Sequence, residues 1–430
     1  MDRRLQKRFW ILVASSMSLA KPGAAAIAGL ASAPSSFAAT QAAWRFFNNE
    51  RVSLRDIIIP IRDAARESVQ QSESPYVLAV HDWSKVACGS HKSSKKDLAQ
   101  LTHSADIGYE LYSCLLVDPA NGVPVAPMEL RLDTKSEMHH TQDPKLVEDV
   151  WHTDQIACVM KSAHSWDIDR KIIHVVDQEA DSVAHYRRWV EMDELFLVRS
   201  EDRSVLWRGE QRRFSSITRT LLNERAFKVI RKITFCDREH ELRVAEAEVI
   251  LNRAAQPRDG DRQLWVPGPP ITARLVISRV YDKNGRKKAE WFLLTNTPND
   301  ATSADIAQWY YWRWRIESFF KLLKSAGFEL EHWRQSSGAA FARRLLVASM
   351  ACVLIWQLER DESEWAVEIK TLLIKMSGRQ MKRSRPFTAP ALLAGLEKLL
   401  CLLEILKVYS ISDIRRLVSM TLPAQLLDTS

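Results

Sequence analysis

The chain has 430 residues, of which 46% are hydrophobic, so it is too apolar for a disordered polymer and long enough for roughly two to four domains. Lysine and arginine outnumber aspartate and glutamate by 61 to 53, and the net charge of +8 favours polyanionic partners. Six cysteines lie far apart, which excludes a zinc-finger pattern and indicates reduced thiols in a cytoplasmic protein.

Residues 1–70 are rich in alanine and poor in strand-forming residues, which predicts a small helical domain able to lie on phosphates. The start of the chain also contains the parts of a secretory signal, namely the basic MDRRLQKR, the apolar FWILVASSMSLA and Ala31-Ser32-Ala33. Lys21-Pro22-Gly23 interrupts that arrangement, and the cysteine pattern does not indicate an oxidising compartment. We therefore favour a helical domain and keep the signal peptide as the alternative.

Residues 71–200 are predicted to form the first part of an α/β core. Three apolar strands come first, and the first of them ends on Asp82. A helical segment then leads to a strand that ends on Asp177, and a second helix leads to a strand that ends on Arg199. This order is typical of helices packed on a mixed sheet.

The rest of the chain is predicted to change from strands to helices. Residues 201–290 alternate apolar and polar side chains in short runs separated by turn clusters, which predicts a β-rich insertion. The second part of the core, 291–360, and the C-terminal segment, 361–430, are mainly helical after Pro298. Leu345–Leu358 is apolar but shorter than the ~20 residues that span a bilayer, so it predicts a buried helix and no membrane partner.

One predicted helix carries a stripe of polar residues. On a wheel of ~100° per residue, Tyr310, Arg313, Glu317 and Lys324 fall within an arc of about 60°. The neighbouring sector is apolar and suited to burial, and it contains Trp309, Trp312, Ile316, Phe319, Phe320 and Leu323. The alternative is a surface helix in which Arg313 and Glu317 form an ordinary i, i+4 ion pair.

Three carboxylates are candidates for a metal site. Glu317 lies among cations and aromatic residues, and Asp82 and Asp177 are predicted at strand ends. If the sheet brings them together, they suit Mg²⁺, a hard cation that prefers oxygen ligands. Two ions about 3.5 to 4 Å apart can activate water or a 3′ hydroxyl for phosphodiester displacement.

Three motifs now resemble a known family. Tyr310-x2-Arg313-x3-Glu317-x6-Lys324 resembles the Tyr-Arg-Glu-Lys signature of DDE transposases in the insertion-sequence-four group, the Tn-five-like enzymes. Asp177-Gln-Glu-Ala-Asp181 resembles the Asp-Arg-Glu-Ala-Asp motif around the second catalytic aspartate, with glutamine in place of the arginine. Asp82-Trp83-Ser84 resembles the first aspartate, which a hydroxyl residue follows two positions later.

The resemblance implies a ribonuclease-H-like (retroviral-integrase-like) catalytic core that the β-rich insertion interrupts. It implies that Asp82, Asp177 and Glu317 are catalytic and hold two Mg²⁺ ions, with Mn²⁺ as a substitute. The residues it implies to contact DNA are Arg199 and Trp291 at a flipped base, together with Tyr310, Arg313, Lys321 and Lys324. From the residues alone, Trp291 also fits a core tryptophan of a β-strand.

The resemblance also implies roles for the ends of the chain. DRRLQKR, KPGA and AWRFFNN are similar to the family's DNA-end-binding domain, which assigns that role to residues 1–70. Residues 361–430 are then a candidate dimerisation segment. The expected assembly is a homodimer that pairs two transposon ends and engages target DNA, in the bacterial cytoplasm and on the nucleoid when bound to DNA.

The predicted function is cut-and-paste transposition. The chain is expected to bind terminal inverted repeats, to cleave DNA with metal through a hairpin intermediate, and to transfer the freed strand. The alternatives are an inactive or inhibitory copy that binds ends, and a ribonuclease-H-like nuclease without strand transfer. A secreted basic protein, cleaved after Ala33, is the third.

Overall fold

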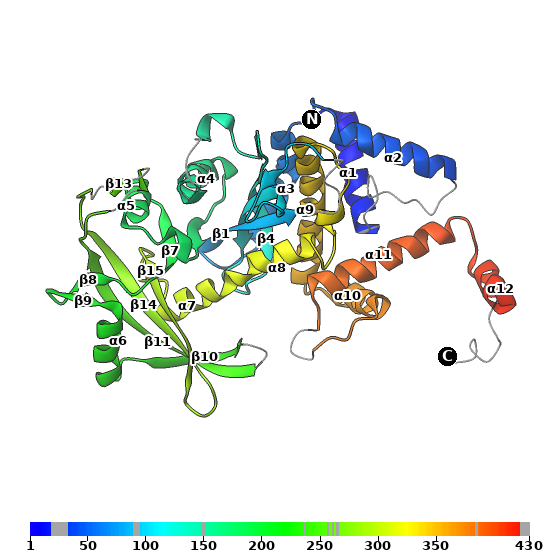
Figure 1. The fold of residues 1–430 in the computed structure, drawn as a ribbon. Coiled ribbons are helices and arrows are strands. Elements are labelled where there is room, and N and C mark those ends of the chain that lie inside the picture. Colours follow the sequence, from blue (N-terminus) through cyan, green and yellow to red (C-terminus); the bar gives the residue numbers. More distant parts are fainter. Residues whose placement is uncertain are drawn as a thin grey trace.

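The structure, a computed structural model, describes residues 1–18, 33–88, 95–147, 152–235, 238–255, 258–259, 262–263, 266–382 and 386–421 (Figure 1). Lys21-Pro22-Gly23 and Ala31-Ser32, on which the signal-peptide alternative depends, lie outside these ranges. The described cysteines carry free thiols, and all of them except Cys401 are buried.

The core of the sheet consists of β1 (Tyr76–Ala87), β3 (Ile107–Val117), β4 (Pro124–Asp133), β6 (Lys171–Val176) and β7 (Leu195–Ser200). Their order is β4-β3-β1-β6-β7, with β1, β3 and β4 antiparallel and with β6 and β7 parallel to β1. Helix α4 (Gln155–Ala163) precedes β6, and α5 (Val183–Glu191) precedes β7. The predicted order of three strands, helix, strand, helix and strand is confirmed. Short edge strands β2 (Ala99–Gln100) and β5 (Met138–His140) pair with β3 and β4.

The strands that follow continue the same sheet. They are β8 (Ser204–Trp207), β9 (Glu210–Arg213), β10 (Lys228–Phe235), β11 (Arg238–Leu251), β14 (Ile271–Tyr281) and β15 (Lys287–Thr295), with helix α6 (Phe214–Asn223) beside them. β15 pairs with β7, so the described strands join into one 13-stranded sheet that runs from β5 to β9. A separate hairpin holds β12 (Arg258–Asp259) and β13 (Arg262–Gln263). The period-2 pattern predicted strands here, but not that they would extend the core sheet.

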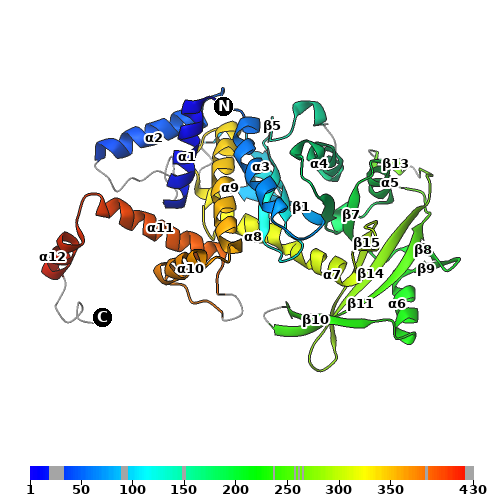
Figure 2. The same ribbon diagram turned by 180° about the vertical axis from the view of Figure 1, so that it is seen from behind.

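Helices cover the core at the end of the molecule away from these strands (Figures 1 and 2). They are α1 (Arg3–Ser18), α2 (Ala33–Phe47), α3 (Leu54–Gln70), α8 (Trp314–Leu323), α9 (Gly338–Arg360), α10 (Glu364–Ser377), α11 (Ala389–Leu406) and α12 (Ile411–Thr421). Helix α7 (Ser303–Trp312) lies instead against β7, β11, β14 and β15. Figure 2 shows α9 between the sheet and helices α1 and α2, and α9 contacts α1, α3 and β4.

The predicted buried helix is part of α9. Among the described residues, α9 is the one helix whose length and composition would suit a membrane span. Within the protein, 83% of its most apolar window is buried, so it serves as the central core helix.

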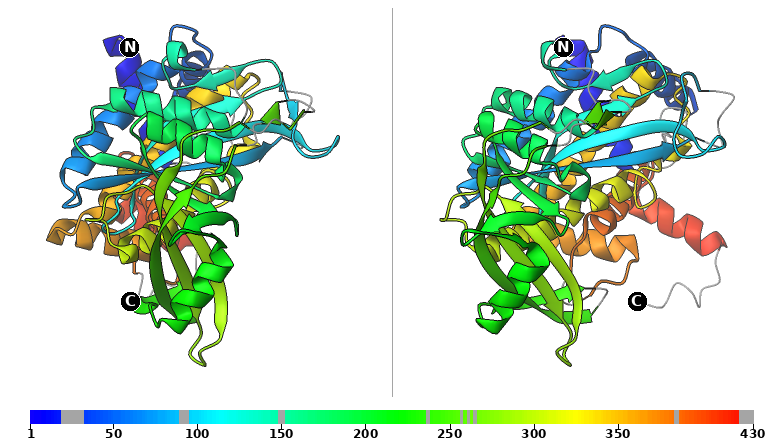
Figure 3. Two further views of the ribbon diagram at one scale, coloured as in Figure 1. Left: turned by 90° about the vertical axis from the view of Figure 1, so that its left-hand side faces the viewer. Right: turned by 60° about the vertical axis from the view of Figure 1, so that its left-hand side comes forward.

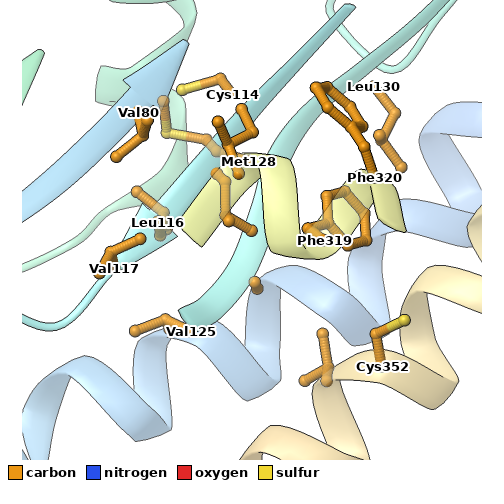
Figure 4. Close-up of a cluster of buried hydrophobic side chains, with 14 of the residues drawn as sticks. Val80, Cys114, Leu116, Val117, Val125, Met128, Leu130, Phe319, Phe320 and Cys352 are labelled. Atoms are coloured by element: carbon orange, nitrogen blue, oxygen red, sulfur yellow. The ribbon is translucent and has the colours of Figure 1, made fainter. Parts of the chain in front are cut away.

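Helix α8 is held by two adjacent phenylalanines. Figure 4 shows Phe319 and Phe320 between strand β4, which carries Met128 and Leu130, and helix α9, which carries Cys352. Phe319 is 1% exposed, and its ring meets Trp356 edge-on with centroids 5.5 Å apart. Since Glu317 lies two residues before Phe319, this packing fixes the part of α8 that carries the candidate catalytic glutamate.

Phe319→Ala is expected to lower the free energy of unfolding by about 3 to 5 kcal/mol, because it opens a cavity in a close-packed core. Urea unfolding followed by circular dichroism measures the change. Trp365→Ala is the control, because Trp365 is 63% exposed and its loss should cost less than about 0.5 kcal/mol. Equal costs for the two substitutions would contradict the packing role of Phe319.

Candidate active site

Asp82 lies within a strand and not at its end, so the predicted strand end is wrong. β1 continues to Ala87, because residues after Asp82 pair with β3. On its other side, β1 pairs with β6 only as far as Val80, which faces Val175. Asp82 therefore lies two residues beyond the last residue of β1 that pairs with β6. Its Oδ1 accepts a hydrogen bond of 2.8 Å from the backbone N–H of Trp83.

Asp177 directly follows β6, as predicted. It caps the short 3-10 helix Gln178–Ala180, and its Oδ1 accepts the Gln178 N–H at 2.7 Å. Because β1 and β6 run parallel side by side, Asp82 and Asp177 reach the same edge of the sheet.

The polar stripe does not lie on one continuous helix. α7 ends at Trp312 and α8 begins at Trp314, with Arg313 between them. The Arg313 N–H bonds to the Tyr310 carbonyl, and the Ile316 N–H bonds to the Arg313 carbonyl, each at 3.1 Å. These i→i−3 bonds tighten the chain to about 3.0 residues per turn. The predicted stripe, which assumed an α-helix of ~100° per residue, therefore does not continue through Arg313.

Lys324 follows the end of α8 and points elsewhere. Its ammonium group donates to the Lys85 carbonyl and lies 3.4 Å from the Glu331 carboxylate. Lys321 is exposed on α8. Among the described residues, no hydrogen bond or ion pair joins either lysine to Asp82, Asp177 or Glu317, so the structure does not bring them to the carboxylates.

The guanidinium of Arg313 brings the three carboxylates together. Its Nη1 lies 3.6 Å from Asp82 Oδ2, and its Nη2 lies 3.3 Å from Asp177 Oδ2. The same Nη2 lies 3.0 Å from Glu317 Oε1. The Arg313 side chain is only 6% exposed, so a buried cation joins carboxylates from β1, from the end of β6 and from α8. The i, i+4 pair of Arg313 and Glu317 that the alternative predicted is present, but Arg313 is buried and also lies against Asp82 and Asp177, so the pair is not confined to a helix surface.

Two further predicted residues hold Asp177. Arg199, on β7, places its Nε 2.7 Å from Asp177 Oδ1, and the Tyr310 hydroxyl donates to the same oxygen at 3.1 Å. Trp291, on β15, is half-buried, and its ring centroid lies 6.4 Å from that of Tyr310. Arg199, Tyr310 and Arg313 therefore contact the carboxylates, and Trp291 lies beside Tyr310.

The pKa of Asp82 is raised to about 6. Burial is the largest cause, and the nearby carboxylates of Glu179 and Glu317 add to it. The Trp83 N–H and Arg313 act in the opposite direction. Burial also raises the pKa of Tyr310, and Asp177 adds to that rise. Burial lowers the pKa of Arg313, but the surrounding anionic groups outweigh it and the net shift is upward.

Asp82→Asn tests this shift. Because the folded-state pKa of about 6 exceeds the unfolded value near 3.9, protonated Asp82 contributes stability below about pH 4, and this is lost as the pH rises through about 6. Relative to the metal-free wild type, Asp82→Asn should therefore become more stable between pH 4 and pH 7, by at most about 3 kcal/mol. Urea unfolding at several pH values measures this. If the difference in free energy of unfolding between Asp82→Asn and the wild type does not change with pH, the raised pKa of Asp82 is contradicted.

Sequence reasoning did not single out Glu179 and His152. Glu179 belongs to the Asp177-Gln-Glu-Ala-Asp181 motif, and its pKa is raised, mainly by burial. Its place two residues after Asp177 was a signal that could have found it. The His152 ring stacks on Trp83 with centroids 4.1 Å apart, and its Nε2 lies 3.6 Å from Glu110. No local pattern links His152 with Trp83, because only the fold makes them neighbours.

The donor set fits a hard divalent cation. Asp82, Asp177 and Glu317 offer carboxylate oxygens, which Mg²⁺ and Mn²⁺ accept as ligands. In the part of the chain that the structure describes, no three acidic, histidine or cysteine side chains are close enough to share an ion. Arg313 lies between the three carboxylates, so joint ligation of one ion requires its guanidinium to move out.

Comparison with known proteins matches most of the chain to one protein family. A family model described as "Transposase DDE domain" matches residues 74–354. Among solved structures, the chain is similar to a piggyBac transposase in a cryo-EM synaptic complex with hairpin DNA, with 11% identity and a TM-score of 0.32. The alignment covers 87% of this chain and 61% of that chain, so this chain spans about three fifths of that protein's length. No curated protein matches.

Proposed function

The chain belongs to the transposase DDE domain family, and from this premise we propose that it excises and inserts a DNA element by cut-and-paste transposition. The observation that carries the proposal is the convergence of Asp82, Asp177 and Glu317 on one buried guanidinium. Three carboxylates from separate elements are costly to bury together unless a cation balances them. A site of this kind suits phosphodiester chemistry with metal.

We propose a ribonuclease-H-like core and membership of the insertion-sequence-four group. The order β4-β3-β1-β6-β7, with three antiparallel strands followed by two parallel ones, supports the core. The Tyr310-x2-Arg313-x3-Glu317-x6-Lys324 spacing supports the group. Residues 71–200 and 291–360 would form the core, with 201–290 as the insertion.

Asp82, Asp177 and Glu317 would hold the divalent cations, Mg²⁺ or Mn²⁺. When bound, such ions supply Lewis-acid stabilisation of the phosphate oxygens and lower the pKa of the attacking hydroxyl or water. Arg199 and Tyr310 hold the Asp177 carboxylate in one orientation. Arg313, which lies among the carboxylates, has the planar donor fork that binds phosphate oxygens.

The DNA would lie across Arg199, Trp291, Tyr310 and Arg313, and Lys321 and Lys324 would extend the contact along α8. The half-buried indole of Trp291 is suited to stack on a base that leaves the helix, which offsets part of the unstacking cost of a hairpin intermediate. Residues 1–70 would recognise the element ends. A homodimer, paired through 361–430, would hold two ends and the target DNA in the bacterial cytoplasm.

A supercoiled plasmid that carries the element ends tests the function. The wild-type chain is expected to cut it with Mg²⁺ or Mn²⁺, to show no cutting with a chelator, and to join a precut end to a second plasmid. Cutting without joining would identify a nuclease that lacks strand transfer. Binding to the ends without metal-dependent cutting would identify an inactive copy. Either result would overturn the proposal.

A further inference from the structure

The turn between β14 and β15 is strongly basic. It carries Lys283, Arg286, Lys287 and Lys288, which are all exposed and which we call the basic tip. Figures 1 and 3 show this turn projecting beyond the other strands at the bottom of the molecule. Residues 282–288 contain no aromatic or aliphatic side chain, so the tip offers charge and flexible donors and no surface for apolar packing.

Asp282 shapes the turn. Its Oδ1 accepts the backbone N–H groups of Asn284 and Arg286, each at 2.9 Å, and its Oδ2 lies 3.1 Å from the Lys288 ammonium. Gly285 provides the left-handed backbone that the turn needs, with φ of +75°. Because these contacts occupy the Asp282 carboxylate, which is the one acidic group of the turn, it does not neutralise the charge of Lys283, Arg286 or Lys287.

Two cations of the basic tip have no acidic partner. Lys287 lies 3.2 Å from Glu290, and Lys288 is paired with Asp282. For Lys283 and Arg286, the described part of the chain shows no ion pair. Both side chains therefore face solvent with full positive charge, and an external anion would meet them without breaking an internal contact.

Strand β15 connects the basic tip to the candidate active site. Trp291 lies four residues after Lys287, a distance of about 13 Å along an extended strand. The Trp291 ring is 6.4 Å from that of Tyr310, and the Tyr310 hydroxyl bonds to Asp177. A nucleic-acid strand that starts at the carboxylates and follows β15 would thus reach the tip.

The neighbouring strand β10 adds charge at the same end of the sheet. In register, Lys232 faces Glu241, Glu241 faces Tyr281, and Tyr281 faces Lys287, so Lys232 of β10 is level with the start of β15. Lys232 is paired with Glu239, whereas Lys228 and Arg231 of β10 are also exposed. β10 therefore adds exposed cations to the strands next to the basic tip.

We propose that the basic tip binds the phosphate backbone of the duplex DNA whose end lies in the candidate active site. The proposal rests on the proposed function and names a binding surface for it. Exposed lysine and arginine side chains on a turn are suited to contact phosphates and not to read bases. A phosphate contact needs only a positively charged side chain that is long enough to reach the phosphate, without a fixed orientation. Successive phosphates of one strand are about 3.4 Å apart along the axis, so the tip would meet the backbone about four base pairs from the base at Trp291.

The test compares two double variants. Lys283→Ala with Arg286→Ala removes the two tip cations that have no ion pair. Lys145→Ala with Lys171→Ala removes the same charge from exposed positions, and Lys171 starts β6 at the end opposite Asp177. All four substitutions are at exposed sites, so both variants should fold, which circular dichroism checks.

The measurement is fluorescence anisotropy with a short duplex of random sequence, between about 50 and 200 mM salt and without divalent ions. Losing two phosphate contacts should reduce the slope of log K against log salt by about 1.8 and weaken binding at low salt about tenfold or more. The control pair should leave the slope unchanged. An unchanged slope for the tip pair, or equal losses for both pairs, would overturn the proposal.

A separate assay, which measures cutting and joining of element ends, tests the proposed function. A chain that binds DNA through the tip but does not cut an element end would support this inference and overturn the proposed function. If the wild-type chain cuts and joins element ends, but the Lys283→Ala with Arg286→Ala variant keeps the wild-type salt slope, the proposed function stands and this inference is overturned. A wild-type chain that does not bind the duplex would overturn both.

Discussion

Glu317→Gln is expected to reduce metal-dependent cutting at element ends by about a thousandfold or more. The substitution keeps the shape of the side chain but removes the negative charge that a divalent cation needs, and metal stabilisation of the transition state is worth several kcal/mol. Asp177→Asn should have the same consequence, since Asp177 contacts the same guanidinium. Cutting of a supercoiled plasmid, followed over time at saturating Mg²⁺, measures the loss.

The fold and DNA binding should survive this substitution. Glu317 is partly exposed on α8, and the adjacent, buried Phe319 and Phe320 hold the helix in place. Losing a negative charge beside DNA should not weaken binding in a gel shift. Glu362→Gln, at an exposed position before α10, is the matched control and should cut as the wild type does. If Glu317→Gln cuts at the wild-type rate, the assignment of the carboxylate site is wrong.

Arg313→Ala is expected to destabilise the metal-free protein by about 3 to 5 kcal/mol. The guanidinium is buried against three carboxylates, and removing one side of a buried ionic cluster leaves the other side uncompensated. A divalent cation would then replace the missing charge. Adding Mg²⁺ or Mn²⁺ should therefore restore much of the lost stability, and it should stabilise the variant far more than the wild type.

Thermal unfolding with and without each metal measures this effect independently of DNA cutting. Lys321→Ala is the control, because it removes one positive charge from the exposed face of the same helix. It should change neither the stability nor the response to metal by more than a small amount. An Arg313→Ala protein that is as stable as wild type without metal would show that the cluster is not held by this cation.

Much of the secondary structure could be predicted from local sequence. Strand β1 contains the apolar run 77–80, and β6 contains four Ile and Val residues on either side of His174; apolar runs of this kind are typical of strands buried on both faces. The Tyr310-x2-Arg313-x3-Glu317 spacing placed these side chains on one side of a helical segment, and the structure does bring Arg313 and Glu317 into contact. These features depend on neighbours a few residues apart, which a single sequence displays.

The strand and helix ends were less predictable. β1 continues beyond Asp82 because β3 supplies hydrogen bonds as far as Ala87, and that partner is not visible in residues 76–82. No proline or glycine lies near the break at Arg313, so local sequence does not predict it. Trp312, at the break, packs against Gly122 from a distant part of the chain, where a Cβ atom would be only 2.3 Å from its ring.

The sequence by itself determined the order of strands and helices in the core, the strand-rich character of residues 201–290, and the three acidic residues that carry the family motifs. Only the tertiary structure decided that β15 joins the insertion to β7, that Arg313 lies between the carboxylates, and that Lys324 turns toward Glu331. The physical reason is distance along the chain. Residue preferences act over a few positions, whereas a buried charge finds its partners among residues that the sheet brings together from far apart.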